Sequence, residues 1–227
     1  MIDLHTHILP GIDDGARTLE ESIKLLRMEI DSGVRTVALT PHYKPNPETL
    51  KDFLRRRQDS YKRLLNEVEK QGLNLSLILG AEVAYSPNLL DLDISELCYE
   101  GTKTILIELP MDHYPSLTRE IFYRLMLDGY TPLIAHAERY TYFARNIETL
   151  EELVDSGALV QVNANGLLRF GKTRKRVINM IEMDLVHIVA TDTHSTELRP
   201  PRLGKAKRIV EQKIDKETAQ RLVNYKL

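Results

Sequence analysis

The chain has 227 residues, enough to bury roughly 70–75% of its unfolded surface around one core, so we predict a single domain over residues 1–227. Its 31 basic and 33 acidic residues give a net charge of -2, which excludes the strongly basic surface that binding to nucleic acid or an anionic membrane requires. Cys98 is the only cysteine, so no intrachain disulfide is possible, and no apolar run approaches the ~18 residues of a membrane span. We therefore expect a soluble cytoplasmic protein with no signal peptide and no membrane-inserted segment.

Helical patterns and short apolar runs alternate along the chain, which is typical of α/β proteins. Thr18 to Glu21 form a capping box, and the apolar stripe that starts at Leu19 ends at Gly33, which predicts a helix before the run 36–39. The arginines at 55–57 are expected on the solvated face of a second helix. The same order of helix, glycine and run recurs, and the predicted strands are residues 2–4, 36–39, 75–79, 105–107, 132–135, 158–162 and 186–190.

Histidines and carboxylates follow these runs where each strand ends. Alternate residues of a strand share a face, so His5 and His7 leave the first strand side by side. The carboxyl ends of parallel strands meet at one rim, and seven such strands favour a closed β/α barrel. We therefore predict one site assembled from the whole chain, with the further members His42, Glu82, Glu108, His136, Asn163, Asp192 and His194.

Each of these residues also has a structural interpretation. Glu82 and Glu108 could form buried salt bridges, because an unpaired buried charge is costly. His42 and His136 could be hydrogen-bonded core histidines, and residues 13–15 could be a simple turn with aspartate at its capping positions. Their shared position at strand ends favours a metal site instead. Imidazole and carboxylate ligands without thiolate suit Mn, Fe or Zn alike.

The opening Asp3-Leu4-His5-Thr6-His7 resembles the PHP family (polymerase and histidinol phosphatase), and the resemblance spans essentially all 227 residues. Asp14 and Glu108 stand where many PHP enzymes have histidine. Both differences agree with one branch, the manganese-dependent protein-tyrosine phosphatases of Gram-positive capsule and exopolysaccharide operons. The motifs similar to that branch lie at residues 3–16, 20–22, 40–42, 80–82, 108–110, 135–140, 161–163 and 191–194.

The resemblance implies a distorted seven-stranded, TIM-like β/α barrel with three metal ions, of which Mn²⁺ is the family-based choice over Fe or Zn. The first ion would be held by His5, His7, Glu82 and Asp192. Glu82 would bridge to a second ion, held also by Glu108 and His136. The third ion would be held by Asp14, His42 and His194.

Arginine suits phosphate because its planar fork binds two oxygens together, and Arg139 and Arg199 match phosphate-binding arginines of the branch. The alternative for each is a surface salt bridge. With Glu82 and Asp192, these arginines are the predicted catalytic residues. A cysteine-based phosphatase is excluded, because Cys98 is followed by Tyr99-Glu100 and lacks a phosphate-cradling loop.

The predicted reaction is hydrolysis of a phosphomonoester, in which a metal-bridging hydroxide attacks phosphorus. The substrate implied by the resemblance is a phosphotyrosine-bearing protein, namely an autophosphorylated, membrane-associated tyrosine kinase that controls capsule or exopolysaccharide synthesis. Two alternatives remain open. One is a phosphatase for a small metabolite such as histidinol phosphate, and the other is a non-catalytic PHP binding module.

Overall fold

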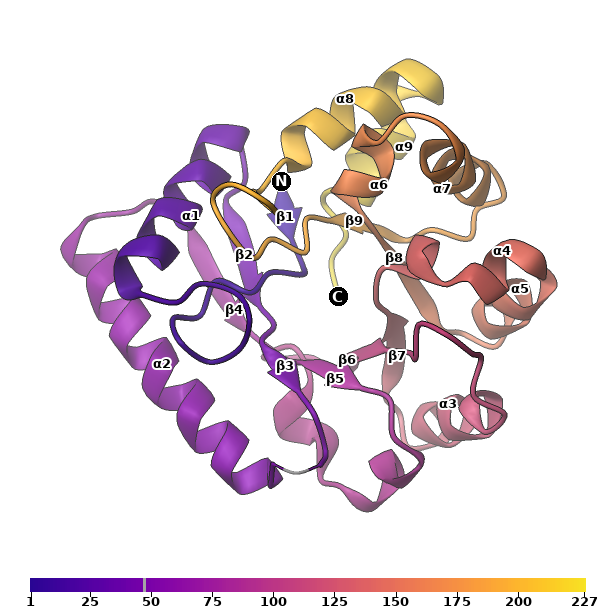
Figure 1. Ribbon diagram of the computed structural model, residues 1–227, viewed down its shortest axis with the longest axis horizontal. Helices are drawn as coiled ribbons and strands as arrows, with labels where there is room; N and C mark the ends of the chain where they lie inside the picture. The colour runs from indigo at the N-terminus through magenta and orange to yellow at the C-terminus, as the bar shows by residue number, and fades with distance from the viewer. Residues whose placement is uncertain (47) are drawn as a thin grey trace.

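The computed structural model describes residues 1–46 and 48–227. Strands lie around the centre of the molecule and helices surround them (Figure 1). The strands are β1 (Ile2–Asp3), β2 (Thr36–Leu39), β3 (His42–Tyr43), β4 (Ser76–Leu79), β5 (Glu82–Ala84), β6 (Thr104–Glu108), β7 (Thr131–Ile134), β8 (Leu159–Asn163) and β9 (Ile188–Ala190).

The helices cover the outer face of the strands (Figure 1). The α-helices are α1 (Leu19–Ser32), α2 (Leu50–Lys70), α3 (Thr118–Leu127), α4 (Thr141–Arg145), α5 (Glu148–Asp155), α6 (Ala164–Leu168), α7 (Lys172–Glu182), α8 (Leu203–Lys213) and α9 (Lys216–Leu222). Three 3₁₀ helices are η1 (Pro87–Asp91), η2 (Ile94–Leu97) and η3 (Ala137–Arg139). In the part of the chain that the structure describes, no helix combines the length and apolar character needed to cross a membrane.

The strands form two parallel sheets. One has the order β1-β2-β4, and the other has the order β3-β5-β6-β7-β8-β9 and curls into a half-barrel. An isolated bridge pairs Thr6 with Thr193, also in the parallel sense, so the segments that follow β1 and β9 lie side by side. The α/β class with parallel strands is therefore confirmed.

The seven-stranded closed barrel is not confirmed, because the described residues form nine short strands in two sheets. Two predicted strands continue beyond a break, so β2 is followed by β3 and β4 by β5. Thr40 and Pro41 interrupt the first pair, and proline has no N–H to donate to a sheet ladder. Gly80 interrupts the second, where its N–H still reaches the carbonyl of Leu39 at 3.0 Å.

Helix α1 forms as predicted at both of its ends. The Thr18 hydroxyl accepts a hydrogen bond from the N–H of Glu21 at 3.2 Å, and Gly33 ends the helix with φ of 93°. The expectation for residues 55–57 is wrong at Arg57. Its guanidinium is buried and donates to the carbonyls of Gly80 and Glu96 at 2.9 and 2.7 Å, so it ties α2 to the segments around β4.

The core has two parts. The larger part lies between strands and helices, as alternate strand residues pack against the apolar stripes of the helices. The smaller part consists of strand residues facing the interior of the ring together with Tyr99, whose hydroxyl donates to the carbonyl of Leu4 at 2.8 Å. This inner cluster packs beneath the ends of the strands, and the predicted site residues lie at those ends.

A buried pair of carboxyl groups underlies the site. Asp3 Oδ1 accepts hydrogen bonds from the N–H groups of His5 and Thr191, at 3.3 and 3.0 Å, and so joins the ends of β1 and β9. Glu29 of α1 is fully buried, and neither of its carboxyl oxygens has a hydrogen-bond partner in the described structure. Burial, followed by repulsion from Asp3, raises the pKa of Glu29 well above its usual value. The raised pKa favours the protonated form of Glu29 in the folded protein.

Glu29→Gln is expected to make the protein more stable than the wild type as the pH rises. The folded wild type retains a proton that its unfolded chain releases near pH 4.5, so its stability falls between that pH and the raised pKa. Glutamine carries no such proton, so the stability gap should widen by up to about 1.4 kcal/mol per pH unit. Urea unfolding at pH 5, 6, 7 and 8 measures it.

Glu20→Gln is the matched control, because Glu20 is exposed on the same helix and a backbone hydrogen bond at the helix start lowers its pKa. For Glu20→Gln, the change of the stability gap with pH should be small and of the opposite sign. A stability gap for Glu29→Gln that does not change with pH would show that Glu29 is ionised in the folded protein.

Candidate metal centre

Four side chains converge just beyond the ends of β1 and β9 and at the start of β5. The Nε2 atoms of His5 and His7 lie 3.2 Å apart. Glu82 Oε2 lies 3.2 and 3.1 Å from these two nitrogens, and Asp192 Oδ1 lies 3.6 and 3.5 Å from them. All four residues are buried.

This geometry fits a metal ion. Nitrogen and oxygen ligands about 2.0–2.2 Å from one ion stand roughly 3.0–3.6 Å from each other, the range seen between these atoms. His7 Nδ1 lies 2.7 Å from the Asp13 carboxylate and His5 Nδ1 lies 3.1 Å from the Gln161 side-chain oxygen, so both histidines donate from Nδ1. Their Nε2 lone pairs therefore face each other, an arrangement that a shared cation stabilises.

Two further groups of ligand-type atoms adjoin the first. Glu82 Oε1 and Glu108 Oε1 lie 2.9 and 3.4 Å from His136 Nε2. Glu82 Oε2 also lies 3.0 Å from Nδ1 of His42. On the other side, Asp14 Oδ1 lies 3.5 Å from Nε2 of both His42 and His194. The structure thus brings together all nine predicted ligands, which are His5, His7, Asp14, His42, Glu82, Glu108, His136, Asp192 and His194.

The close sets of ligand atoms overlap one another. His42 lies with His7, Asp14 and His194 in one set and with Glu82 and Glu108 in another, and a third set joins His5, His7 and Asp192. Glu82 lies at the middle of the cluster, with one oxygen toward His5 and His7 and the other toward His136. Which ion each residue holds stays a prediction.

The mutual charges of the cluster shift its pKa values strongly. Burial alone would lower the pKa of His136, but hydrogen bonds to Glu108 and Glu82 raise it to about 9. Burial would raise the pKa of Asp192, but the charge of His5 lowers it to about 2. Burial and the neighbouring His7 lower the pKa of His194 to about 4. Asp192 is therefore ionised at neutral pH, as a carboxylate that ligates a metal must be.

Two of the clustered residues have an unusual backbone. His136 and Asp192 have φ of 32° and 53°, in the left-handed region that side chains other than glycine rarely adopt. Such strain persists only where surrounding contacts hold it, and it concentrates at functional sites. Here the Gln161 side chain accepts from the N–H of His136 at 2.7 Å, and the N–H of Asp192 donates to the carbonyl of His5 at 2.8 Å.

Sequence reasoning missed the residues that orient the ligands. Asp13 accepts from the N–H groups of His42 and Gly15, both at 2.9 Å, in addition to its bond with His7. Gln161 bonds both His5 and His136. Gly15 packs so closely on the His7 backbone that a Cβ there would lie 2.0 Å from its carbonyl oxygen. The Asp13-Asp14-Gly15 motif had pointed to this loop, but not to the separate role of Asp13.

The two predicted arginines both reach Asp192 Oδ2. Arg199 Nη2 lies 2.5 Å from this oxygen and Arg139 Nη1 lies 3.5 Å from it, while Asn163 donates to it at 2.8 Å. Both arginine side chains stay partly open to solvent, at 43% for Arg139 and 35% for Arg199. The other oxygen of Asp192 faces His5 and His7, so Asp192 lies between the arginines and these two histidines.

The two remaining histidines and the cysteine lie outside the cluster. His113 is largely exposed and pairs with Asp112, and His187 accepts from the N–H of Val160 at 3.2 Å. Cys98 is buried, and burial raises the pKa of its thiol to about 11, the opposite of what a nucleophilic thiolate needs.

Asp13→Asn is expected to weaken metal binding by about 10- to 100-fold, because the amide cannot accept from His7, His42 and Gly15 with equal strength. Calorimetric titration of the metal-free variant with Mn²⁺ measures the change. Asp31→Asn, an exposed change on α1, serves as the control. Unchanged affinity in Asp13→Asn would mean that the loop positions His7 without this carboxylate.

A parallel α/β fold that gathers imidazoles and carboxylates at its strand ends defines a metal-dependent enzyme of the PHP-like type. The model of the family described as capsular polysaccharide synthesis, CpsB/CapC, matches residues 1–226. The chain belongs to this CpsB/CapC family.

Known proteins similar to the chain agree with this assignment. The tyrosine-protein phosphatase YwqE of Bacillus subtilis is 35% identical over 96% of this chain and 86% of its own length. A solved structure, described as one of YwqE from Bacillus subtilis and CpsB from Streptococcus pneumoniae, "unique metal-dependent tyrosine phosphatases", superimposes with a TM-score of 0.89 at 32% identity, covering 97% of this chain and 90% of the other. The histidinol phosphate phosphatase of Lactococcus lactis, at a TM-score of 0.59 and 14% identity over 93% and 94% of the two chains, shares the fold.

Proposed function

We propose that this protein is a metal-dependent phosphomonoester hydrolase that acts on phosphotyrosine in proteins. The observation that carries the proposal is the cluster of nine ligand-type residues with two partly exposed arginines beside it. The cluster supplies anionic and imidazole ligands for cations, and the arginines supply donors for a dianion. The family and the tyrosine phosphatases similar to the chain support the same reaction.

The nine residues described above would hold the metals, and Glu82 lies at the middle of this set. Bound metals would supply a nucleophilic hydroxide near neutral pH and neutralise charge on the phosphoryl oxygens. The donor set suits Mn²⁺, Fe or Zn, and we propose three Mn²⁺ ions because of the resemblance to the manganese-dependent branch. Asp13 and Gln161 would keep the histidine lone pairs directed at the ions.

The arginines would bind and orient the phosphate. Each guanidinium can offer two parallel N–H donors to phosphoryl oxygens, with a strength that a neutral donor lacks. Arg199 and Arg139 already lie at Asp192, so a phosphate beside that ligand would meet both. A tyrosine phenolate has a pKa near 10 and leaves more readily than an alkoxide, so the site needs no strong general acid.

The proposed substrate is a phosphorylated tyrosine kinase, associated with the membrane and controlling capsule or exopolysaccharide synthesis. The proposed location is the cytoplasm, where the phosphorylated tail of such a kinase would lie. A family described by capsular polysaccharide synthesis supports the pathway, and the names of the relatives support the phosphotyrosine.

A comparison of substrates on the metal-loaded protein tests the proposal. Turnover should be highest on a phosphotyrosyl peptide and much lower on a phosphoseryl peptide and on histidinol phosphate. Chelation should abolish activity, and Mn²⁺ should restore it. Undiminished activity after verified metal removal would refute the proposal, and preferential turnover of histidinol phosphate would assign the chain to small metabolites.

A further inference from the structure

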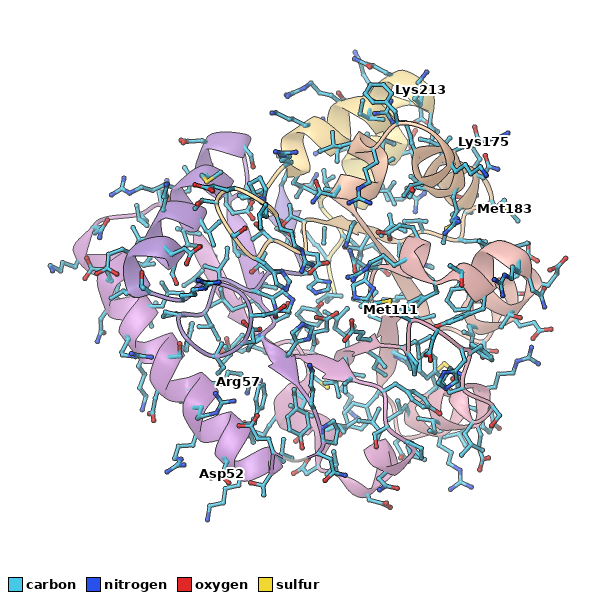
Figure 2. All side chains as sticks on the ribbon, in the orientation of Figure 1. Asp52, Arg57, Met111, Lys175, Met183 and Lys213 are labelled. Atoms are coloured by element: carbon cyan, nitrogen blue, oxygen red, sulfur yellow. The ribbon has the colours of Figure 1, made fainter. Side chains whose placement is uncertain are left out.

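A cavity of about 540 Å³ extends from the predicted phosphate site toward α7. Asp192, Arg139 and Arg199 line it beside the metal centre, and Arg169, which follows α6, and Arg176 of α7 line it as well. In Figure 2, Met111, another lining residue, lies toward the middle of the molecule, and Lys175, which precedes the lining residue Arg176 on α7, lies toward its outside. The cavity therefore leads outward from the reacting centre.

The cavity is larger than one phosphate needs. A phosphate has five heavy atoms, and at about 30 Å³ for each water-sized group it fills roughly 150 Å³. Most of the 540 Å³ therefore remains for other parts of a substrate.

The outer part of the cavity is positively charged without being neutralised. Four arginines line the whole cavity against two carboxylates, Glu138 and Asp192. Within residues 1–46 and 48–227, neither Arg169 nor Arg176 forms an ion pair, and Arg176 makes one bond, to the carbonyl of Glu138 at 2.8 Å. Glu138 is turned away, because its carboxylate is buried and accepts from the N–H of Asn163 at 3.1 Å.

A neighbouring arginine shows what a structural role looks like here. Arg174 donates to the carbonyls of Leu167 and Leu168, at 2.6 and 3.0 Å, and lies over the ring of Phe170 at 4.2 Å. The hydrogen bonds of its guanidinium are thus made within the protein. Arg169 is exposed and its side chain has no such partner in the described chain, so its guanidinium is free to bind a ligand.

We propose that Arg169 and Arg176 form a second anion-binding subsite, which receives a carboxylate or a second phosphate that flanks the phosphotyrosine of the substrate. This inference rests on the proposed function and names a feature of its substrate. A polypeptide occupant also accounts for Leu198, which lines the cavity and is 89% exposed, because an apolar side chain at the rim can pack against a bound chain.

Peptide kinetics with the metal-loaded full chain test the subsite. The reference is a phosphotyrosyl peptide with neutral flanks, and the test peptides carry one glutamate at each of the neighbouring positions in turn, or a second phosphotyrosine. At the position that reaches Arg169, the anion should raise kcat/KM by about tenfold, as expected for a partly exposed charge-assisted hydrogen bond. A higher kcat/KM with the second phosphotyrosine alone would identify the subsite as phosphate-specific. A higher kcat/KM with either anion would identify it as a general anion site.

Arg169→Glu should reduce the ratio of anionic to neutral peptide to one or below. The matched control is Arg63→Glu, which changes the net charge by the same amount. Arg63 is exposed on α2, across the molecule from α7 (Figure 1). The control should keep the tenfold ratio. Equal ratios in the two variants, or no gain at any position in the wild type, would overturn the subsite.

The failure of the subsite can be told from failure of the proposed function. An enzyme that hydrolyses p-nitrophenyl phosphate but does not distinguish the peptides has the function without the subsite. If no phosphomonoester is hydrolysed, calorimetric binding of the same peptides with a non-hydrolysable phosphonate still measures the ratio. Equal affinities of anionic and neutral phosphonate peptides would then refute the subsite directly.

Discussion

Glu82→Ala is expected to lose metal and activity together, with kcat/KM falling by roughly 10³-fold or more, well beyond the ~10- to 100-fold cost of losing a residue that only orients a ligand. The reason is its central place, with Oε2 near His5, His7 and His42 and Oε1 near His136. Its removal would leave several imidazoles without their shared carboxylate. Metal analysis of the purified variant and phosphotyrosyl-peptide kinetics give the two readings.

The control for this change is Glu69→Ala, which removes an exposed carboxylate from α2. Thermal unfolding in the presence of chelator separates loss of metal from loss of fold. Full metal content and normal turnover in Glu82→Ala would place the reacting centre elsewhere in the molecule.

Arg139→Ala is expected to lower kcat/KM by about 30- to 1,000-fold, or about 2–4 kcal/mol, because it removes a charge-assisted contact to the phosphate. Metal content should be unchanged, since a guanidinium cannot ligate a cation and Arg139 meets the cluster only through the outer oxygen of Asp192. Lysine at this position should restore part of the loss, because it returns the charge without the planar fork.

Arg145→Ala is the matched control, as Arg145 is exposed on the adjacent helix α4 and does not line the cavity. Near-normal kinetics in Arg139→Ala would reduce Arg139 to a surface partner of Asp192. Loss of metal would instead mean that it holds Asp192 in position. The same measurements on Arg199→Ala compare the arginine that lies closer to that carboxylate.

The strands could be predicted because their apolar runs are continuous and bounded by glycine or by polar residues. All seven predicted runs contain strands, whereas β3 and β5 had no pattern of their own, being two and three residues long. Helices α8 and α9 were not predicted, although Leu203, Ala206 and Val210 are buried at helical spacing and gave a usable signal. The separation into two sheets depends on hydrogen bonds at residues 40–41 and 80–81, which composition does not encode.

The position of the site followed from the rule that strand ends share one rim, and that rule found every predicted ligand except Asp14, which lies in the loop after His7. The rule did not identify Asp13 and Gln161, because a residue that orients a ligand is recognised by the contacts of its side chain rather than by its position at a strand end. Arg169 and Arg176 escaped for another reason. They lie after α6 and on α7, away from any strand end, and only the folded chain brings them to the cavity.

The cluster draws its members from both ends of the chain. Asp3 and Thr191, which bond beneath it, are 188 residues apart in sequence. An ion shared by His7 and Asp192 would close almost the entire chain into one loop, and the entropy that a cross-link removes from the unfolded chain grows with loop length. The segments at His7 and at Asp192 could then not open independently of each other, although local opening is a common start of proteolysis. Bound metal would thus hold the two ends of the ring of strands together as well as supply the chemistry.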